Sequence, residues 1–188
     1  MTTAADRSHD PRAQRSRAAL RAALVAMLRE QPIEQISIVA LTARAGVGYA
    51  TFFRNYADIE AVLSDLSAML IAELASLVAP AAADGGDRAA AQAISRFAHD
   101  RHTALKPLFV GASAALQRDI ITRATKTAQA QGHAHHPKLP TELAIAHSVT
   151  VIVTVLVWCL AQDDRASEGE LAAIVEQLAF APLGKSVA

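Results

Sequence analysis

Polar and aromatic side chains gather between Ser37 and Tyr56, in the run S-I-V-A-L-T-A-R-A-G-V-G-Y-A-T-F-F-R-N-Y. Arginine, asparagine, threonine and tyrosine form hydrogen bonds with phosphate oxygens and with the edges of bases. The side chains expected on or near one exposed side are Tyr49, Ala50, Thr51, Arg54 and Asn55. A helical hairpin that only packs is the alternative, but it would not need Tyr49, Arg54 and Asn55 on one side. The segment therefore offers contact with nucleic acid.

Two short helices joined by a tight turn must hold these side chains. Ser37 is a good N-cap, and apolar residues recur after it at three- and four-residue spacing. Gly46 follows as the residue best able to take the left-handed backbone that ends a helix. A second helix from about Gly48 would bury Phe52 and Tyr56. This pattern predicts a helix-turn-helix, whose second helix enters a groove of DNA.

The run A-R-A-G-V-G-Y-A-T-F-F-R-N-Y-A-D-I-E-A-V-L resembles the signature of the tetracycline-repressor (TetR) family of bacterial transcription regulators, A-G-V-S-x-x-T-x-Y-x-H-F-x-x-K-x-x-L. The matching positions are occupied by Ala45, Gly46, Val47, Thr51, the aromatic Tyr56 and Leu63. The resemblance implies an all-α protein, in which a three-helix DNA-binding domain precedes a helical ligand-binding and dimerisation domain. It also implies a homodimeric, ligand-responsive repressor that binds a pseudo-palindromic operator.

Three positions depart from that signature. Gly48 replaces the usual Ser that caps the recognition helix, Phe53 replaces a Tyr that meets a phosphate, and Ile59 replaces a Lys aimed at the backbone. Each change removes a polar contact, and phosphate contacts supply much of the affinity for DNA. The alternative function is therefore a helical ligand-binding or interaction module with weakened or lost DNA binding.

Further contacts with DNA are expected around the two short helices. Arginines of the N-terminal segment, Arg12, Arg15 and Arg17, suit phosphate or minor-groove contacts, and a solvated arginine face is the alternative. Tyr49 is expected to touch a base because it lies early on the recognition helix. The complete set expected at DNA is Arg15, Arg17, Ser37, Thr42, Arg44, Gly48, Tyr49, Ala50, Thr51, Phe53, Arg54 and Asn55.

The formal charge is zero over the chain but is unevenly distributed. Residues 1–56 hold eight arginines against four acidic residues, a net charge of +4. The remaining residues hold ten basic and fourteen acidic side chains, a net charge of −4. A polyanionic partner is therefore expected at the N-terminal end.

The chain is organised into three expected parts: a flexible arm over residues 1–13, a DNA-binding domain over 14–57 and a helical regulatory and dimerisation domain over 58–188. Besides the two short helices, helices are predicted at about 14–30, 58–80, 88–102, 113–131, 141–162 and 168–181. We expect a linker at 81–87, an interruption at Lys106-Pro107 and a loop over 132–140, because glycines and prolines favour turns.

Residues 141–162 form the most hydrophobic segment. Its β-branched residues favour a strand locally, but its length favours a helix that is buried on nearly every side. A membrane span is the alternative, although the run barely reaches the minimum length and contains His147, Ser148, Thr150 and Thr154. We expect no membrane contact and a homodimer formed through about 141–162 and 168–181, as the family resemblance implies.

An unidentified small-molecule effector is a further expected partner, again implied by the resemblance. Candidate pocket residues are large or polarisable groups on helices of the body, and core packing is the alternative for each. They are Met69, Phe97, Phe109, Leu116, His147 and Trp158. His147 is notable because a buried imidazole needs a hydrogen-bond partner.

Signatures of catalysis and of metal binding are missing from the sequence. It has no G-x-S-x-G elbow, P-loop, dinucleotide fingerprint or H-E-x-x-H, and Cys159 has an apolar setting that disfavours a nucleophile. His133, His135 and His136 have no nearby carboxylate or thiolate, so neither a metal nor another cofactor is expected. One cysteine allows no intrachain disulfide, and a cytoplasmic location is expected.

Overall fold

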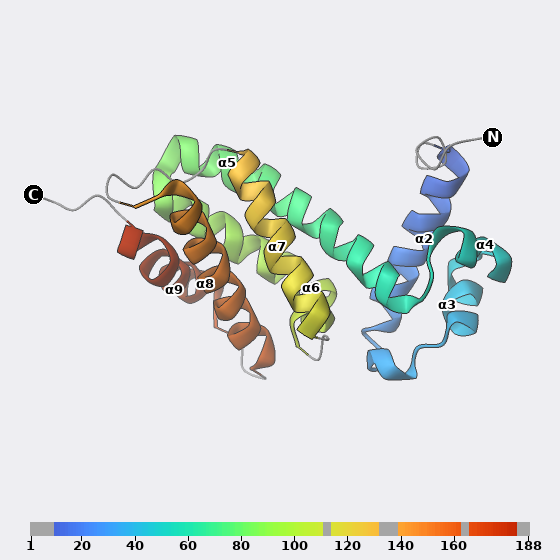
Figure 1. The fold of residues 1–188 in the computed structure, drawn as a ribbon. Helices are drawn as coiled ribbons and strands as arrows, with labels where there is room; N and C mark the ends of the chain where they lie inside the picture. The colour runs from blue at the N-terminus through green and yellow to red at the C-terminus, as the bar shows by residue number, and fades with distance from the viewer. Residues whose placement is uncertain (1–9, 111–113, 132–138, 163–165, 184–188) are drawn as a thin grey trace, which may run out of the picture. The chain divides into compact units, whose positions relative to one another are not determined.

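The computed structural model describes residues 10–110, 114–131, 139–162 and 166–183. All regular elements within these ranges are helical, which confirms the predicted all-α class. The chain divides into two compact units, Met1–Leu66 and Ser67–Ala188, which we call the head and the body. Figure 1 shows α2, α3 and α4 grouped in the head and α6 to α9 grouped in the body.

Three helices build the head. Helix α2 spans Pro11–Met27 and begins three residues earlier than expected, because Asp10 caps it and proline suits a first turn. The last residues of the expected arm are therefore helical, and residues 1–9 lie outside the described residues. A short 3₁₀ turn at Ile33–Gln35 leads to α3, Ile38–Ala45, and then to α4, Tyr49–Asn55.

The core of the head joins α2 to the two short helices. Leu20 and Leu24 of α2, Leu41 of α3 and Phe52 of α4 are completely buried. Truncating one such side chain to alanine costs about 2–5 kcal/mol, so this cluster fixes how the helices pack. Burial of Phe52 and Tyr56 confirms the face of the second short helix that was predicted to point inward.

Helix α5 runs over Ile59–Asp100, and its only non-helical backbone is at Gly86, with φ 67° and ψ −156°. The predicted linker at 81–87 was therefore wrong over most of its length. The helix continues through Pro80 because a run of alanines follows it and an exposed proline forfeits only one backbone hydrogen bond. Gly86 provides the break because glycine tolerates positive φ.

The body is completed by α6 (His102–Phe109), α7 (Ala114–Ala130), α8 (Thr141–Ala161) and α9 (Glu168–Val175), followed by a π turn at Glu176–Phe180 and a 3₁₀ turn at Ala181–Leu183. The expected interruption at Lys106-Pro107 was wrong, since α6 continues through Pro107 and the preceding break falls at Arg101. Burial of Leu105, Leu108 and Phe109 offsets the hydrogen bond that Pro107 cannot make. Residues 132–138 of the expected loop lie outside the described residues.

Helices α5 and α8 are each long and apolar enough to cross a membrane by length and composition alone. Core helices of soluble proteins pass the same test. In the body, α8 packs against α6, α7, α9 and the π turn. Its inward face is made of buried side chains such as Ile145, Val149, Leu156 and Leu160, so the core accounts for the apolar character of that face.

Candidate nucleic-acid interface and ligand cavity

Local geometry in the head agrees with the predicted helix-turn-helix. The Ser37 hydroxyl accepts a hydrogen bond from the Ala40 N–H at 3.1 Å and so caps α3. Gly46 ends α3 with φ 64° and ψ 28°, the left-handed conformation expected of it. Gly48 begins α4 without any side-chain cap, so the polar contact expected to be lost there is indeed missing.

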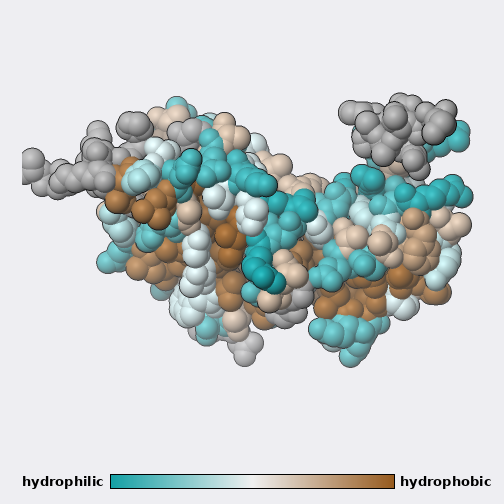
Figure 2. All heavy atoms as spheres, viewed as in Figure 1, coloured by the Kyte–Doolittle hydropathy of each residue, from teal (hydrophilic) through white to brown (hydrophobic). Residues whose placement is uncertain are grey.

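The outward face of α4 carries two aromatic rings and a guanidinium. Tyr49 is 54% exposed and Phe53 is 48% exposed, and their ring centroids are 5.1 Å apart in an edge-to-face arrangement. Ala50 and Arg54 are exposed beside them, and Thr51 is half-buried. Large exposed rings on the second helix of a helix-turn-helix are suited to apolar contacts with bases and sugars. Hydrophobic residues are also visible on the head in Figure 2, along its lower side in that view.

Arg17 of α2 lies against the end of α4. Its Nε donates to Asn55 Oδ1 at 3.3 Å, and its guanidinium carbon lies 5.8 Å from the centroid of the Tyr56 ring. The Asn55 amide nitrogen in turn donates to the Thr51 carbonyl at 2.8 Å. Arg17 and Asn55, predicted separately, therefore share one edge of the head.

A carboxylate network that the sequence interpretation missed anchors the same edge. The Arg21 guanidinium forms an ion pair with Asp65 at 2.6 Å, and the Tyr56 hydroxyl donates to the same Asp65 oxygen. Burial, and next the hydrogen bond to Asp65, raise the pKa of Tyr56 well above its usual range. Asp65 thereby ties the start of α5 to α2 and to the end of α4. Residues 21 and 65 are too far apart in the sequence for a local pattern to pair them.

Arg44 is engaged with an acidic neighbour. Its guanidinium donates to both oxygens of Glu30, at 2.6 and 2.7 Å, and this hydrogen bonding lowers the pKa of Glu30. Both side chains are exposed, so the pair is a weak, surface-type interaction. Arg44 therefore reaches a phosphate only in competition with Glu30.

Thr42 and Arg15 differ in their availability. Thr42 is buried, and its hydroxyl donates to the carbonyls of Ile38 and Val39 at 2.8 and 3.0 Å. The hydroxyl is therefore directed into its own helix, and contact of Thr42 with a phosphate stays a prediction. Arg15 is exposed, and its Nε donates to the Pro11 carbonyl at 3.1 Å. Its other guanidinium nitrogens carry additional donors.

A cavity of about 440 Å³ lies in the body between α5, α7 and α8. Phe109 is the one candidate pocket residue that lines it. Met69 and Trp158 are 41% and 47% exposed, whereas Phe97 and Leu116 are buried in the core. His147 does not line the cavity either, and its buried Nε2 has no hydrogen-bond partner among the described residues. Of the six candidates, only Phe109 therefore lies at this cavity, and the assignment of the other five to a ligand pocket stays a prediction.

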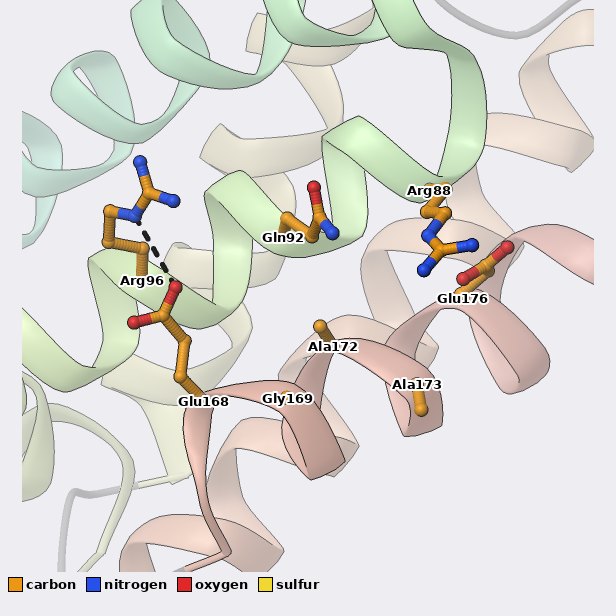
Figure 3. Close-up of a pocket in the computed structure, with 8 residues that line it drawn as sticks. All are labelled: Arg88, Gln92, Arg96, Glu168, Gly169, Ala172, Ala173 and Glu176. Carbon is orange, nitrogen blue, oxygen red and sulfur yellow. Dashed lines mark hydrogen bonds and ion pairs between the residues drawn. The ribbon is translucent and has the colours of Figure 1, made fainter.

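A second, polar cavity of about 330 Å³ separates the last part of α5 from α9 (Figure 3). Arg96 forms an ion pair across it with Glu168 at 3.3 Å, and Arg88 and Glu176 point toward one another from opposite walls. Next to it, the buried Ser95 hydroxyl donates to the Glu168 carbonyl at 2.5 Å. These contacts hold the first turn of α9 against α5, and the opposite charges balance one another.

The outer face of α8 is uncharged and exposed. Leu143 is 56% exposed, and Thr150, Thr154 and Trp158 continue along the same side of the helix. Leu178, beyond α9, is a further exposed apolar residue. Figure 2 shows hydrophobic residues over α8 and α9.

Among the described residues, no three His, Cys, Asp or Glu side chains lie close enough to hold an ion. His133, His135 and His136 lie outside the described residues.

Comparisons with known proteins bear on the fold. No protein-family model and no curated protein matches the chain. A TetR transcriptional regulator from Streptococcus agalactiae 2603V has a TM-score of 0.63 at 15% identity, over 89% of this chain and 95% of that one. A putative TetR-family regulator from Mesorhizobium loti MAFF303099 has a TM-score of 0.60 at 13% identity, over 90% and 96%. RolR, solved in complex with the ligand resorcinol, has a TM-score of 0.54 at 17% identity, over 93% and 97%.

These likenesses, at low identity and high coverage, establish the fold. The chain has the architecture of TetR-type regulators, with a helix-turn-helix head followed by a helical body. The resemblance found in the sequence is confirmed at this level.

Proposed function

We propose that this chain is a DNA-binding transcription regulator, acting in the cytoplasm as a homodimeric repressor that responds to a small molecule. The observation that carries the proposal is the outward face of α4. Tyr49, Phe53 and Arg54 are exposed there on a helix whose opposite side is anchored by the buried Phe52. A regulator fold with such a helix supports DNA recognition more than any other activity.

The proposed interface divides by chemistry. Tyr49, Ala50, Thr51 and Arg54 face the bases and neighbouring phosphates, while Phe53 packs on a sugar or a base. Arg15 and Arg17 meet the phosphate backbone of DNA from α2, and Arg17 is held beside the recognition helix by its hydrogen bond to Asn55, the last residue of α4. At Ser37 and Gly48, the starts of α3 and α4 lie close to the phosphate backbone of DNA. Arg44 contributes once Glu30 releases it.

The proposed dimer forms through α8 and the segment after it. Leu143, Trp158 and Leu178 are large apolar groups exposed on the body. Packing this face on its copy across a two-fold axis buries them and places two heads on one duplex. Two heads then read a pseudo-palindromic site, which doubles the few base contacts that one head makes.

The proposed effector binds in the 440 Å³ cavity, a volume within the usual range for small-molecule sites. Helix α8 lines this cavity with one face and exposes the opposite face. A ligand that binds one arrangement of α8 better than another therefore changes the preferred arrangement of the dimer. The complex of RolR with resorcinol supports a small-molecule site in this fold.

The experiment is selection of bound sequences from random duplex DNA by the purified chain, followed by fluorescence anisotropy over a range of salt concentrations. A pseudo-palindromic site should be enriched, and its affinity should fall steeply as salt rises. Arg54→Ala should weaken binding and lower the salt slope by about one if Arg54 meets a phosphate. Tyr49→Ala should weaken binding without that change in slope.

The control is Arg118→Ala, which removes an exposed arginine of α7 whose side chain bonds, among the described residues, only to the Ala114 carbonyl. It should bind DNA as the wild type does. If no sequence is enriched, or if the affinity ignores salt and both head substitutions, the proposal is wrong.

A second function has specific support in the head. Gly48 leaves α4 without a side-chain cap, and Glu30 holds Arg44. Both features weaken DNA binding and favour a ligand-binding or interaction module that has lost it. Ligand binding to the body, together with failure of the duplex selection, would favour this second function.

A further inference from the structure

The walls of the large cavity are almost entirely apolar. Aliphatic residues of α5, α7 and α8 form most of the lining, together with the rings of Phe109 and Phe180. The neutral polar residues are Thr127, Gln131 and Ser148. The Ser148 hydroxyl already donates to the Ala179 carbonyl at 3.0 Å, so it is satisfied without a ligand. The cavity therefore selects an occupant by apolar surface.

One side chain breaks this pattern. Asp87 is the only charged residue among the described residues that line the cavity, and it directly follows the break in α5 at Gly86. It is exposed, so it lies at the solvent end of the cavity, and its side chain forms no ion pair or hydrogen bond with other described residues. The cavity thus combines an apolar interior with a carboxylate at its rim that has no ion-pair partner among the described residues.

The described lining disfavours one class of ligand. No lysine, arginine or histidine is present among the described lining residues. A carboxylate or phosphate placed there would lose its water without gaining a cation and would also face Asp87. An ammonium group gains at the same position, because it stays partly hydrated at the rim and pairs with the carboxylate.

The side chains around the cavity confirm that space is left for an occupant. Ile152 lies on the inward side of α8 between the buried Ser148, Val155 and Leu156, yet it is only half-buried. Ile71, Leu74 and Val78 of α5 are likewise half-buried where they line the cavity. Covering these surfaces contributes to binding in proportion to the apolar area removed from water.

From these features we infer that the cavity binds a lipophilic ammonium compound, with its apolar body inside and its cationic group at Asp87. This ligand class is the effector class of the regulator, and in that respect it rests on the proposed function. Binding itself is independent of DNA.

The test is calorimetric titration of the full chain, without DNA and at neutral pH, with decylamine, decanoate and decanol. The three probes share one alkyl chain and differ in charge. Decylamine should bind at least about tenfold more tightly than decanoate, because the carboxylate attracts one and repels the other. Asp87→Asn should weaken decylamine about threefold, strengthen decanoate and leave decanol unchanged.

Two matched variants of α7 locate the binding site. Ala124 lines the cavity, so Ala124→Phe should fill it and abolish binding of decylamine. Ala115 is exposed on the same helix and does not line it, so Ala115→Phe should bind like the wild type. Thermal melting of each variant checks folding, and Asp87→Asn, a surface change, keeps the test valid if Ala124→Phe unfolds.

The inference is overturned if decanoate binds as tightly as decylamine, if Asp87→Asn leaves decylamine affinity unchanged, or if none of the probes binds. Failure of the proposed function gives a different result. In that case decylamine binds as expected, but it does not release the selected duplex, or no duplex is selected at all.

Discussion

Replacing Asp65 by alanine tests whether one carboxylate anchors the head. The substitution removes the ion pair with Arg21 and the hydrogen bond from the Tyr56 hydroxyl. The side chains of Arg21 and Asp65 are 21% and 31% exposed, so solvent screens the pair only in part. A hydrogen bond to a charged group contributes about 1.5–3 kcal/mol and a partly exposed pair up to about 1 kcal/mol.

The expected loss for Asp65→Ala is therefore about 2–4 kcal/mol of unfolding free energy. For a chain of this size, that loss lowers the melting temperature by roughly 4–16 °C, as followed by circular dichroism. The matched control is Asp84→Ala, which removes an exposed carboxylate of the same helix that has no partner among the described residues. Melting of Asp65→Ala within about 1 °C of the control would refute the anchoring role.

Tyr56→Phe examines the hydroxyl alone through its pH dependence. The pKa of Tyr56 is raised above its ordinary value of 10.0, first by burial and then by the hydrogen bond to Asp65. Because the folded state holds this proton more tightly, the stabilisation is fully present below pH 10.0 and is lost as the pH rises further. The melting temperature of the wild type should therefore fall more steeply above that pH than that of Tyr56→Phe. Parallel curves would contradict the assignment.

Other predictions concern three separate parts of the chain. Glu30→Gln should free Arg44 and remove a negative charge, so anisotropy should show DNA affinity rising about two- to fivefold; unchanged affinity would mean that Arg44 does not reach DNA. Gly46→Ala should cost about 1–2 kcal/mol in thermal melting, because the left-handed backbone strains any residue with a Cβ; an unchanged melting temperature would contradict that. Leu143→Asp should leave the chain monomeric in analytical ultracentrifugation, because it places a charge in the proposed dimer interface on α8. A persistent dimer would show that the interface does not include Leu143.

Local signals allowed the head to be predicted. The ends of α3 are marked by Ser37, whose hydroxyl caps the first turn, and by Gly46, which takes positive φ. The burial of Phe52 followed from helical spacing. Such features depend on neighbours within a few residues, so the sequence alone contains them.

Long-range features of the structure were not predictable in the same way. The contacts of Asp65 and the lining of the cavity depend on which helix faces meet, and periodicity does not specify that. The continuation of α6 through Pro107 was likewise not predicted, because there packing outweighs local preference. Residue type did not indicate which side chains line the cavity for the same reason, since Trp158 is large and apolar but lies on the outer side of α8.

The position of Trp158 makes the protein its own reporter. It is the only tryptophan in the chain, and it is almost half exposed on the outer side of α8. The wavelength of its fluorescence emission therefore depends on whether that side of α8 is exposed to solvent or buried. Emission that shifts to shorter wavelength on concentration would register self-association without a label, and a spectrum independent of concentration would place the indole outside the contact.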